Sequence, residues 1–349
     1  MSKVLVTGGA GFIGHHVATA WRKRGAEVVV LDSLRTGKRE NLSHIPAEGG
    51  LTFIEGSITD PATVKRAMEG CSVVHHLAAQ VSVPESMEHP LECVEINVHG
   101  TLNVLDAAKA AGVRRVVYTS SIGVLEPGSG AAAAEDDVSP EAPSSSVYRA
   151  VKWHMERAVS DARRGGLDVV VLRPGGCLGP WDMHVGTGGV VVAVVRGAVT
   201  WWVDGLVHMV DVRDVARAHV AALVAPSQRT YNLAGHGVRV AALLRSIAKR
   251  YGGAVPERSL APDAALARAD DEERAAAPVR GRVVFPRELV DIALSGAPVS
   301  DDLARSELGF DPRPLDEALD ASVAWFRRTG HLQSTAPHPA ALAASQRPS

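Results

Sequence analysis

Tyr148 and Lys152 are the two side chains whose types and spacing most directly suggest chemistry. They lie four residues apart in SSSVYRAVKWHMERAV, so a helix would place the phenol and the ammonium on one face. The ammonium can favour the phenolate, which is otherwise scarce because free tyrosine has a pKa near ~10. A phenolate beside a carbonyl or carbinol is the acid–base half of a hydride transfer. The pattern is also common by chance, and a surface Tyr–Lys pair is the alternative.

A glycine-rich loop near the N-terminus could supply the other half, a dinucleotide site. Gly8, Gly11 and Gly14 follow the apolar run KVLVT, and Phe12 and Ile13 open a helical stretch. In such a loop the first glycine allows a tight turn, the second lets backbone approach a pyrophosphate, and the third allows close helix–strand contact. The phosphates then lie at a helix N-terminus, where free N–H groups favour anions. The alternative is a tight turn without a ligand.

Asp32 is the residue expected to set the preference between NAD and NADP. It ends the run EVVVLD, eighteen residues after Gly14. A carboxylate there can accept hydrogen bonds from both adenosine ribose hydroxyls and would repel a 2′-phosphate, which favours NAD over NADP. Arg35 and Lys38 are nearby cations that could instead hold a 2′-phosphate, and Asp32 could also be a turn residue.

Apolar runs separated by helical patterns predict the fold class. The runs are apolar throughout rather than alternating, which is typical of parallel strands buried on both faces by helices. We therefore expect an α/β fold with a Rossmann-type, doubly wound parallel sheet. The expected strands cover residues 3–7, 27–32, 51–56, 72–79, 114–121 and 167–174.

The chain divides into three predicted parts. Residues 1–174 form the NAD-binding domain, including the Tyr–Lys helix, and 175–333 mostly form a smaller C-terminal substrate-binding lobe interleaved with the sheet. The tail 334–349 has too little apolar content to pack and is expected to be disordered. The low-complexity segment 128–137 is expected to be a mobile loop beside the active site.

Composition excludes several classes of function. The net charge is −2, so nothing favours nucleic acid or an anionic membrane as a partner. Three cysteines without disulfide or metal spacing, and no apolar signal segment, favour a cytoplasmic protein. The fourteen histidines show no metal-ligand spacing, so we expect no metal.

Several motifs in order point to one family. The segments VLVTGGAGFIG, VVVLDSLRTGKRENL, VVHHLAAQVSVPES, INVHGTLNVLDAAKAAGVRRVVYTSS, VYRAVK and VDVRDVARAHVAAL resemble the extended short-chain dehydrogenase/reductase family, in its NAD-dependent epimerase/dehydratase branch. The resemblance covers roughly residues 1–330. It implies an enzyme with a Rossmann fold that uses NAD.

The resemblance also implies roles for individual residues. Tyr148 matches the catalytic acid/base, and Lys152 matches the lysine that lowers its pKa and holds the nicotinamide ribose. Ser121 matches the hydroxyl that bonds the reacting oxygen, with Ser120 as the near alternative. Asn97 matches a residue that supports the active site and lies near the cofactor. Capping or core polar bonding is the alternative for Ser121 and Asn97.

Further positions match the family's cofactor and substrate contacts. Backbone at the end of the fourth strand lines the cofactor, main chain after the third strand lies near the adenine, and two residues of QVSVPES lie on the substrate-side loop. These positions are Leu77, Ala78 and Ala79, then Ser57 and Ile58, then Ser82 and Val83. Ser57 departs from the family, which usually has an aspartate there that contacts the adenine, and main-chain contacts from Ile58 can take its place. For Ser82, capping or core polar bonding is the alternative.

Three departures bear on the substrate. Gly176, also a substrate-side position, stands where nucleotide-sugar epimerases usually have an asparagine that contacts a substrate phosphate. Val207 lies close to the place of an arginine that holds the pyrophosphate. Ser121 and Ile122 stand where sugar 4,6-dehydratases have an Asp–Glu pair, so a dehydratase is disfavoured.

Three hypotheses follow. The first is an NAD-dependent epimerase acting on a secondary carbinol of a sugar nucleotide through a 4-keto intermediate, as QVSVPES and GKRENL favour. The second is an NAD(P)H-dependent ketone or aldehyde reductase with a non-nucleotide substrate. Gly176, Val207 and the segment SDDLARSELGFDPRPLDEALDASVAWF, which also resembles flavonol- and steroid-type reductases, favour it. The third is a catalytically inactive NAD-sensing or scaffold protein.

The resemblance further implies a homodimer. The helices in INVHGTLNVLDAAKAAG and VYRAVKWHMERAVSDA carry apolar residues on more than one face, and in the family they form a four-helix interface. Val104 and Trp153 are candidate partner-facing residues. Alternatively, the chain's own C-terminal lobe covers this surface. Trp201 and Trp202 could line a pocket, or belong to the core or a dimer contact.

Overall fold

A computed structural model describes residues 3–46, 50–80, 89–126, 132–143, 146–276 and 283–332. Ser82, Val83, the tail 334–349 and part of the segment 128–137 lie outside these ranges.

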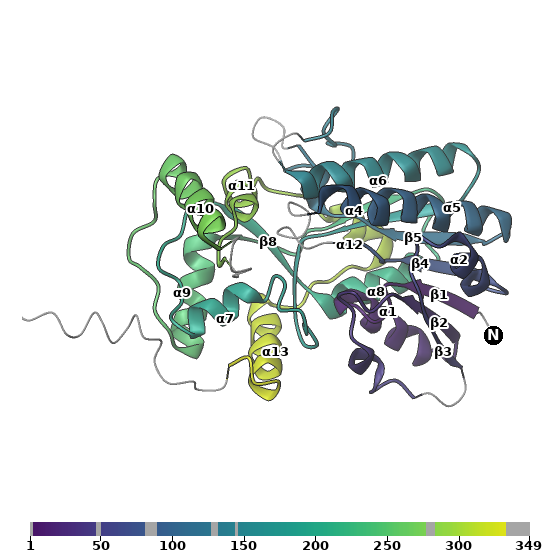
Figure 1. Ribbon diagram of the computed structural model, residues 1–349, viewed down its shortest axis with the longest axis horizontal. Helices are drawn as coiled ribbons and strands as arrows, with labels where there is room; N and C mark the ends of the chain where they lie inside the picture. Colours follow the sequence, from purple (N-terminus) through teal and green to yellow (C-terminus); the bar gives the residue numbers. More distant parts are fainter. Residues whose placement is uncertain are drawn as a thin grey trace, which may run out of the picture.

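A seven-stranded parallel sheet forms the centre of the larger domain, on the right of Figure 1. Its order is β3-β2-β1-β4-β5-β6-β9, and every pair of neighbours is parallel. The strands are β1 (Lys3–Thr7), β2 (Glu27–Asp32), β3 (Leu51–Glu55), β4 (Val73–His76), β5 (Arg115–Thr119), β6 (Val169–Pro174) and β9 (Thr230–Leu233). The expected α/β, Rossmann-type fold is confirmed.

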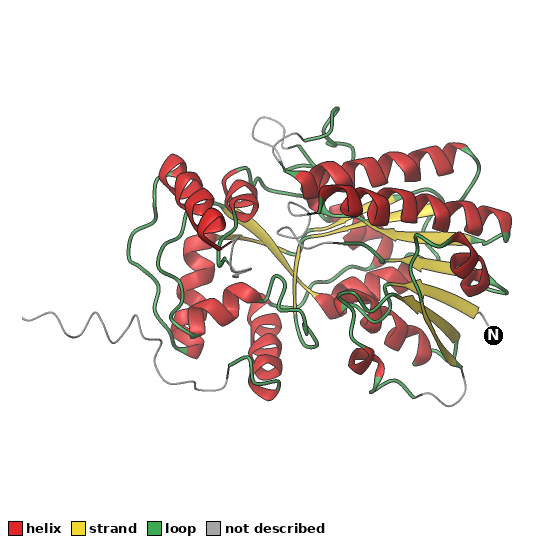
Figure 2. Cartoon of the chain, in the orientation of Figure 1, coloured by secondary structure: helices red, strands yellow, loops and turns green. Residues whose placement is uncertain are grey.

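Helices cover both faces of this sheet because its strands are apolar on both (Figure 2). Every residue of β4, β5 and β6 is buried. One face packs on α2, α5 and α6, and the other packs on α1 and α8. The elements of this domain are α1 (Phe12–Arg22), α2 (Pro61–Met68), α4 (Pro90–Val94), α5 (Gly100–Ala110), α6 (Val147–Arg164), α8 (Val212–Ala221), α12 (Asp302–Leu308), the 3-10 turns η1 (Arg39–Leu42) and η3 (Ile122–Val124), and the π-helical turn η2 (Glu95–His99).

Two features of this domain differ from the expected boundaries. β4 ends at His76, so Leu77, Ala78 and Ala79 follow the strand instead of ending it. Two elements from beyond residue 174 also belong to this domain. The seventh strand, β9, pairs with β6, and the helix α8 packs beside α1 on one face of the sheet. The carboxyl ends of β1, β4 and β5 are therefore neighbours at one edge of a sheet built from both halves of the chain.

The smaller lobe has its own sheet and core. Its strands β7 (Gly176–Leu178), β8 (Leu206–Asp211) and β10 (His236–Arg239) form a second sheet in the order β10-β8-β7. The helices α7, α9, α10 and α13 lie on the left of Figure 1, away from the large sheet. The lobe's helices are α7 (Gly189–Val195), α9 (Val240–Tyr251), α10 (Pro262–Ala276), α11 (Arg287–Leu294) and α13 (Leu315–Arg328).

Trp201 and Trp202 belong to the core of this lobe. Their side chains are buried, and each indole N–H has a partner within the lobe: Trp201 Nε1 donates to Glu272 Oε1 and Trp202 Nε1 donates to the carbonyl of Pro256, both at 2.8 Å. Of the alternatives for this pair, the structure supports the core.

The expected partner-facing residues need a correction. Val104 is fully buried in the core between α5 and the sheet, so it cannot face a partner; the error is one of helical phase. Trp153 is half-buried and donates from Nε1 to the carbonyl of Ser139, within its own chain. None of the helices in the described ranges combines the length and the apolar character that a bilayer crossing requires.

Candidate active site

The glycine loop forms a tight turn between β1 and α1. Gly8 has φ +69°, a conformation that L side chains rarely adopt, and its N–H donates to the carbonyl of Leu31 at 2.8 Å. A Cβ on Gly14 would lie 2.1 Å from the carbonyl oxygen of Gly8, so only glycine fits there. Gly11 caps the helix, and Phe12 and Ile13 form its first turn, where N–H groups lack helical partners.

The backbone after β4 lies directly against this loop. A Cβ on Gly8 would lie 2.7 Å from the amide nitrogen of Ala78. Leu77 N–H donates to the carbonyl of Thr7, and Ala78 N–H donates to Thr7 Oγ1. The segment Leu77–Ala79 and the glycine loop are thus brought together, as the sequence predicts for the walls of one dinucleotide site.

Asp32 lies at the end of β2 beside the same loop. Its carboxylate accepts from Ala10 N–H at 2.9 Å and from Leu34 N–H at 2.8 Å. Burial raises the pKa of Asp32, although these two bonds lower it. Each carboxylate oxygen has further acceptor capacity for ribose hydroxyls. Arg35, the neighbouring cation, forms an ion pair with Glu92 on α4.

Ser57 and Ile58 follow β3, next in the sheet to β2. The Ser57 hydroxyl bonds Thr59, and the Ile58 carbonyl accepts from Asn103 Nδ2 at 3.0 Å. Ile58 is buried against α5, where a Cβ on Gly100 would lie 2.6 Å from its side chain. The structure thus fixes this main chain at the same edge of the sheet as Asp32.

Asn97 lies in the π-helical turn η2 and is buried. Its Oδ1 accepts from Gln80 N–H at 2.7 Å, and its Nδ2 donates to the Gln80 carbonyl at 2.9 Å. These bonds fix the backbone that continues from Ala79. The position of Asn97 agrees with a supporting role beside the active site.

Ser121 and Tyr148 are brought together at the end of β5. Ser121 caps η3 by accepting from Gly123 N–H at 3.1 Å. Burial raises the pKa of the half-buried Tyr148 phenol, while a hydrogen bond with Ser121 lowers it. Ser120 acts instead on the buried Tyr118, whose pKa it lowers, whereas Ser121 Oγ and Tyr148 Cε1 would lie 3.3 and 3.9 Å from a Cβ on Gly123.

Lys152 is buried one turn further along α6. Its Nζ donates to the carbonyl of Thr119 at 3.4 Å. Burial lowers the pKa of Lys152 to about 8, while Glu156 and Cys93 raise it. A buried ammonium near the reaction edge can hold a ribose hydroxyl. The lowering of the Tyr148 pKa by Lys152 stays a prediction.

Comparisons with known proteins identify the family. The model of the NAD dependent epimerase/dehydratase family matches residues 4–234. The chain belongs to this family. It is therefore an enzyme of the epimerase and oxidoreductase kind, as the motifs predict, and the family's cofactor is NAD.

Relatives with different activities span nearly the whole chain. A cinnamoyl-CoA reductase 1 from Oryza sativa is 28% identical and covers 96% of this chain and 94% of its own. The UDP-glucose 4-epimerase of Thermus thermophilus in complex with NAD is 31% identical, with TM-score 0.74 over 93% of this chain and 99% of its own. The same enzyme of Thermotoga maritima with UDP-glucose is 27% identical, with TM-score 0.75 over 94% and 99%.

The residues present fit the family's cofactor. The turn before α1 is tight, because side chains on Gly8 and Gly14 would meet backbone at 2.7 and 2.1 Å, and it leads into the N-terminus of α1, where free N–H groups suit a pyrophosphate. Asp32 offers ribose acceptors, and Lys152 lies against the end of β5, two strands from β1, where it and Tyr148 would face the nicotinamide ribose.

One residue near Tyr148 escaped the sequence analysis. Glu288, on α11 of the smaller lobe, is buried at 6% exposure and accepts a hydrogen bond from Ser146, the N-cap of α6. Nothing local in FPRELVDIAL marks this glutamate, because its partner lies 142 residues earlier in the chain.

Gly176 and Val207 lie in the small sheet. Gly176 pairs with Met209, and a Cβ on it would lie 3.1 Å from the Met209 sulfur. Val207 is a partly buried member of the lobe's apolar clusters. Neither position offers a charged or polar side chain to a diphosphate.

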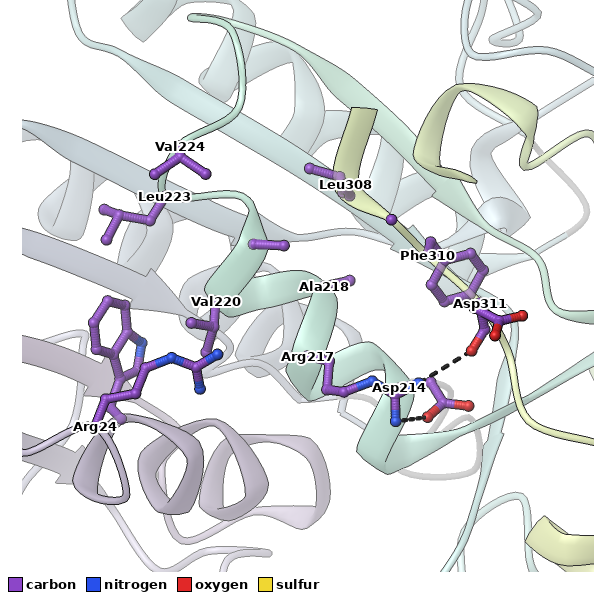
Figure 3. Close-up of a pocket in the computed structure, with 13 residues that line it drawn as sticks. Arg24, Asp214, Arg217, Ala218, Val220, Leu223, Val224, Leu308, Phe310 and Asp311 are labelled. Carbon is purple, nitrogen blue, oxygen red and sulfur yellow. Dashed lines mark hydrogen bonds and ion pairs between the residues drawn. The ribbon is translucent and has the colours of Figure 1, made fainter. Parts of the chain in front are cut away.

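A separate cavity of about 450 Å³ lies away from these residues (Figure 3). Within it, Arg217 bonds both Asp214 and the carbonyl of Asp311. It lies between α1, α8 and the segment after α12, and no residue of the candidate active site lines it. Across the described ranges, no three His, Cys, Asp or Glu side chains converge as metal ligands would.

Proposed function

We propose that this enzyme is an epimerase that inverts a secondary carbinol of a sugar nucleotide through a 4-keto intermediate, with Tyr148 as acid/base. The observation that carries the proposal is that Ser121 and Tyr148 lie together beside Gly123 at the end of β5: a Cβ on Gly123 would lie 3.3 Å from Ser121 Oγ and 3.9 Å from Tyr148 Cε1. The likeness to the Thermotoga maritima epimerase with UDP-glucose supports the substrate class.

The chain's own residues handle the proton. Tyr148 as phenolate accepts the hydroxyl proton of the substrate, and Ser121 donates a hydrogen bond to the same oxygen as it becomes a carbonyl. When bound, NAD would supply reversible hydride transfer at the carbinol carbon. After the ketone turns over in the pocket, Tyr148 gives the proton back to the alkoxide of the epimer. Lys152 holds the ribose and keeps positive charge near the phenolate.

Net reduction of a ketone or aldehyde is the second candidate. Gly176 and Val207 support it because the diphosphate contacts that a nucleotide sugar needs are missing at both positions, and the full-length likeness to a cinnamoyl-CoA reductase agrees. In this reaction Tyr148 donates a proton once and the cofactor exchanges.

The cofactor content of the purified protein separates the two candidates. An epimerase should retain NAD through gel filtration and should interconvert UDP-glucose and UDP-galactose, followed by NMR, without added cofactor. Tyr148→Phe should retain the NAD and lose about 10²–10⁴-fold in turnover. An empty site, with turnover of ketones only when NADH or NADPH is added, would favour the reductase. Full activity in Tyr148→Phe would contradict both.

We also propose a homodimer joined through α4 and α5. Leu91, Val94 and Leu102 are exposed at 85%, 39% and 41% along these helices, and apolar side chains gathered on one face are typical of an interface. Location in the cytoplasm stays a prediction, supported by three cysteines that form no disulfide.

A further inference from the structure

Glu288 connects the smaller lobe to the helix that carries Tyr148. Ser146 is the N-cap of α6: its Oγ accepts from Arg149 N–H at 3.0 Å and donates to Glu288 Oε1. The backbone N–H of Tyr148 faces the Glu288 carboxylate closely enough to lower the pKa of Glu288. A carboxylate from a distant part of the chain therefore completes the cap of this helix.

These contacts matter because the first N–H groups of a helix have no helical partners. Ser146 satisfies the N–H of Arg149, and Glu288 in turn accepts from the Ser146 hydroxyl. A negative charge at this end is also favoured by the helix dipole. The first turn of the helix that carries Tyr148 is thus held by Glu288 through Ser146.

The rest of α11 is anchored in the smaller lobe. Val290 and Ala293 are buried in one cluster with Trp201 and Val203. Arg287 forms an ion pair with Asp270 on α10. Movement of this lobe relative to the sheet would therefore be transmitted through Glu288 to the first turn of α6.

The carboxylate of Glu288 also acts on the chemistry of its neighbours. After burial and the Ser121 bond, it is the next influence on the pKa of Tyr148, which it raises. Burial raises the pKa of Glu288 itself, the bonds from Ser146 and Tyr148 lower it, Asp291 raises it and Arg149 lowers it. Within the described residues, its Oε2 is buried and accepts no hydrogen bond.

We propose that Glu288 is a positioning residue that fixes the first turn of α6 and couples the seating of the substrate lobe to the acid–base state of Tyr148. The proposal rests on the proposed role of Tyr148. It holds for an epimerase or a reductase, since both use the phenol.

The first test needs no substrate. The chain has four tyrosines, and near-ultraviolet absorbance follows their ionisation as the pH is raised. Wild type and Glu288→Gln are each compared with the same protein carrying Tyr148→Phe, and the difference between the two curves is the titration of Tyr148. Glu288→Gln keeps an acceptor for Ser146 and Tyr148 but removes the charge. We expect this change to raise the acid dissociation constant of Tyr148 by about 2- to 10-fold. Asp291→Asn makes the same change of charge on the same helix, at a residue whose ion-pair partner is Arg287 and not Ser146, and should have a smaller effect.

The second test measures positioning. Glu288→Ala should lower kcat with UDP-glucose about 10-fold or more, while its affinity for NAD stays within about twofold, because the cofactor contacts lie on other elements. Glu288→Gln should recover most of that loss.

An unchanged Tyr148 titration in Glu288→Gln would overturn the coupling. Equal losses of NAD affinity and kcat in Glu288→Ala would reduce Glu288 to a general structural cap and also overturn the proposal. Failure of the wild type to turn over UDP-glucose would instead count against the proposed substrate, and the titration would still decide the role of Glu288.

Discussion

Asn97 holds both backbone groups of Gln80. Gln80 N–H donates to Asn97 Oδ1 at 2.7 Å and the Gln80 carbonyl accepts from Asn97 Nδ2 at 2.9 Å. Asn97 reaches this position from a π-helical turn between α4 and α5, a feature often found at functional sites. The pair fixes the chain that leaves Ala79, which lies beside the glycine loop.

Replacing Asn97 should destabilise the fold and disturb the site together. Asn97→Ala leaves two buried backbone groups of Gln80 without partners, at a cost of about 1–3 kcal/mol each. Asn97→Asp keeps the acceptor for Gln80 N–H but, when ionised, cannot donate to the Gln80 carbonyl. The free energy of unfolding, measured in urea, should be highest for the wild type, lower for Asn97→Asp and lowest for Asn97→Ala. Asn103→Ala, which removes a single bond to Ile58, is the control, and an equal effect of both alanines would contradict the special role of Asn97.

Gly14 should be intolerant of any side chain. A Cβ there would lie 2.1 Å from Gly8 O, so Gly14→Ala must displace the loop, and NAD affinity should fall at least about 10-fold because the pyrophosphate loses its close backbone approach. Gly165→Ala, at the far end of α6, is the control: its Cβ would lie 3.1 Å from the flexible end of the Lys109 side chain, which a small shift relieves. Isothermal titration with NAD measures both, and equal affinities would refute the assignment of the loop.

Asp32 should make NAD(H) the preferred cofactor by more than about tenfold, because charge-assisted bonds to the ribose contribute ~1.5–3 kcal/mol each. Asp32→Ser should remove most of that preference. Titration of wild type and variant with NAD and NADP provides the measurement. Tighter binding of NADP by the wild type would mean that Arg35 or Lys38 governs the pocket.

Burial of the Lys152 ammonium should lower the free energy of unfolding at neutral pH. Burial lowers its pKa from 10.5 to about 8, so the unfolded chain binds more protons between these values and the wild type gains stability as pH rises through that window. Lys152→Met should therefore be more stable than wild type at neutral pH, by up to about 3 kcal/mol, and lose the advantage as pH approaches 10.5. Urea unfolding across this range is the check. The same variant should lose NAD affinity and turnover, and a less stable variant at neutral pH would contradict the buried-charge account.

The proposed dimer can be tested on its exposed apolar residues. Leu102→Glu, on α5, should shift the protein to monomer in sedimentation velocity at micromolar concentration, since a charge would be buried at the interface. Val224→Glu is a control because Val224 is 87% exposed beyond α8. A wild type that sediments as a monomer would mean that the exposed residues of α4 and α5 serve another purpose.

The sequence by itself determined the features that lie within one turn or one helix. The glycine loop, Asp32 at the end of its strand, and Tyr148 with Lys152 on one helix were all predictable because apolar runs and glycine spacing encode local structure. The same periodicity predicted the parallel sheet. It could not give the phase of α5 well enough to show that Val104 faces the core.

Only the tertiary structure decided the contacts between distant segments. The seventh strand β9, the bond from Ser146 to Glu288 and the two bonds from Asn97 to Gln80 join residues that no local pattern relates. Such contacts depend on how elements pack, and packing follows from the whole set of buried surfaces rather than from spacing along the chain. For this protein the sequence named the candidate reacting groups, and the packing of the smaller lobe against α6 supplied Glu288, which bonds the N-cap of the helix that carries Tyr148.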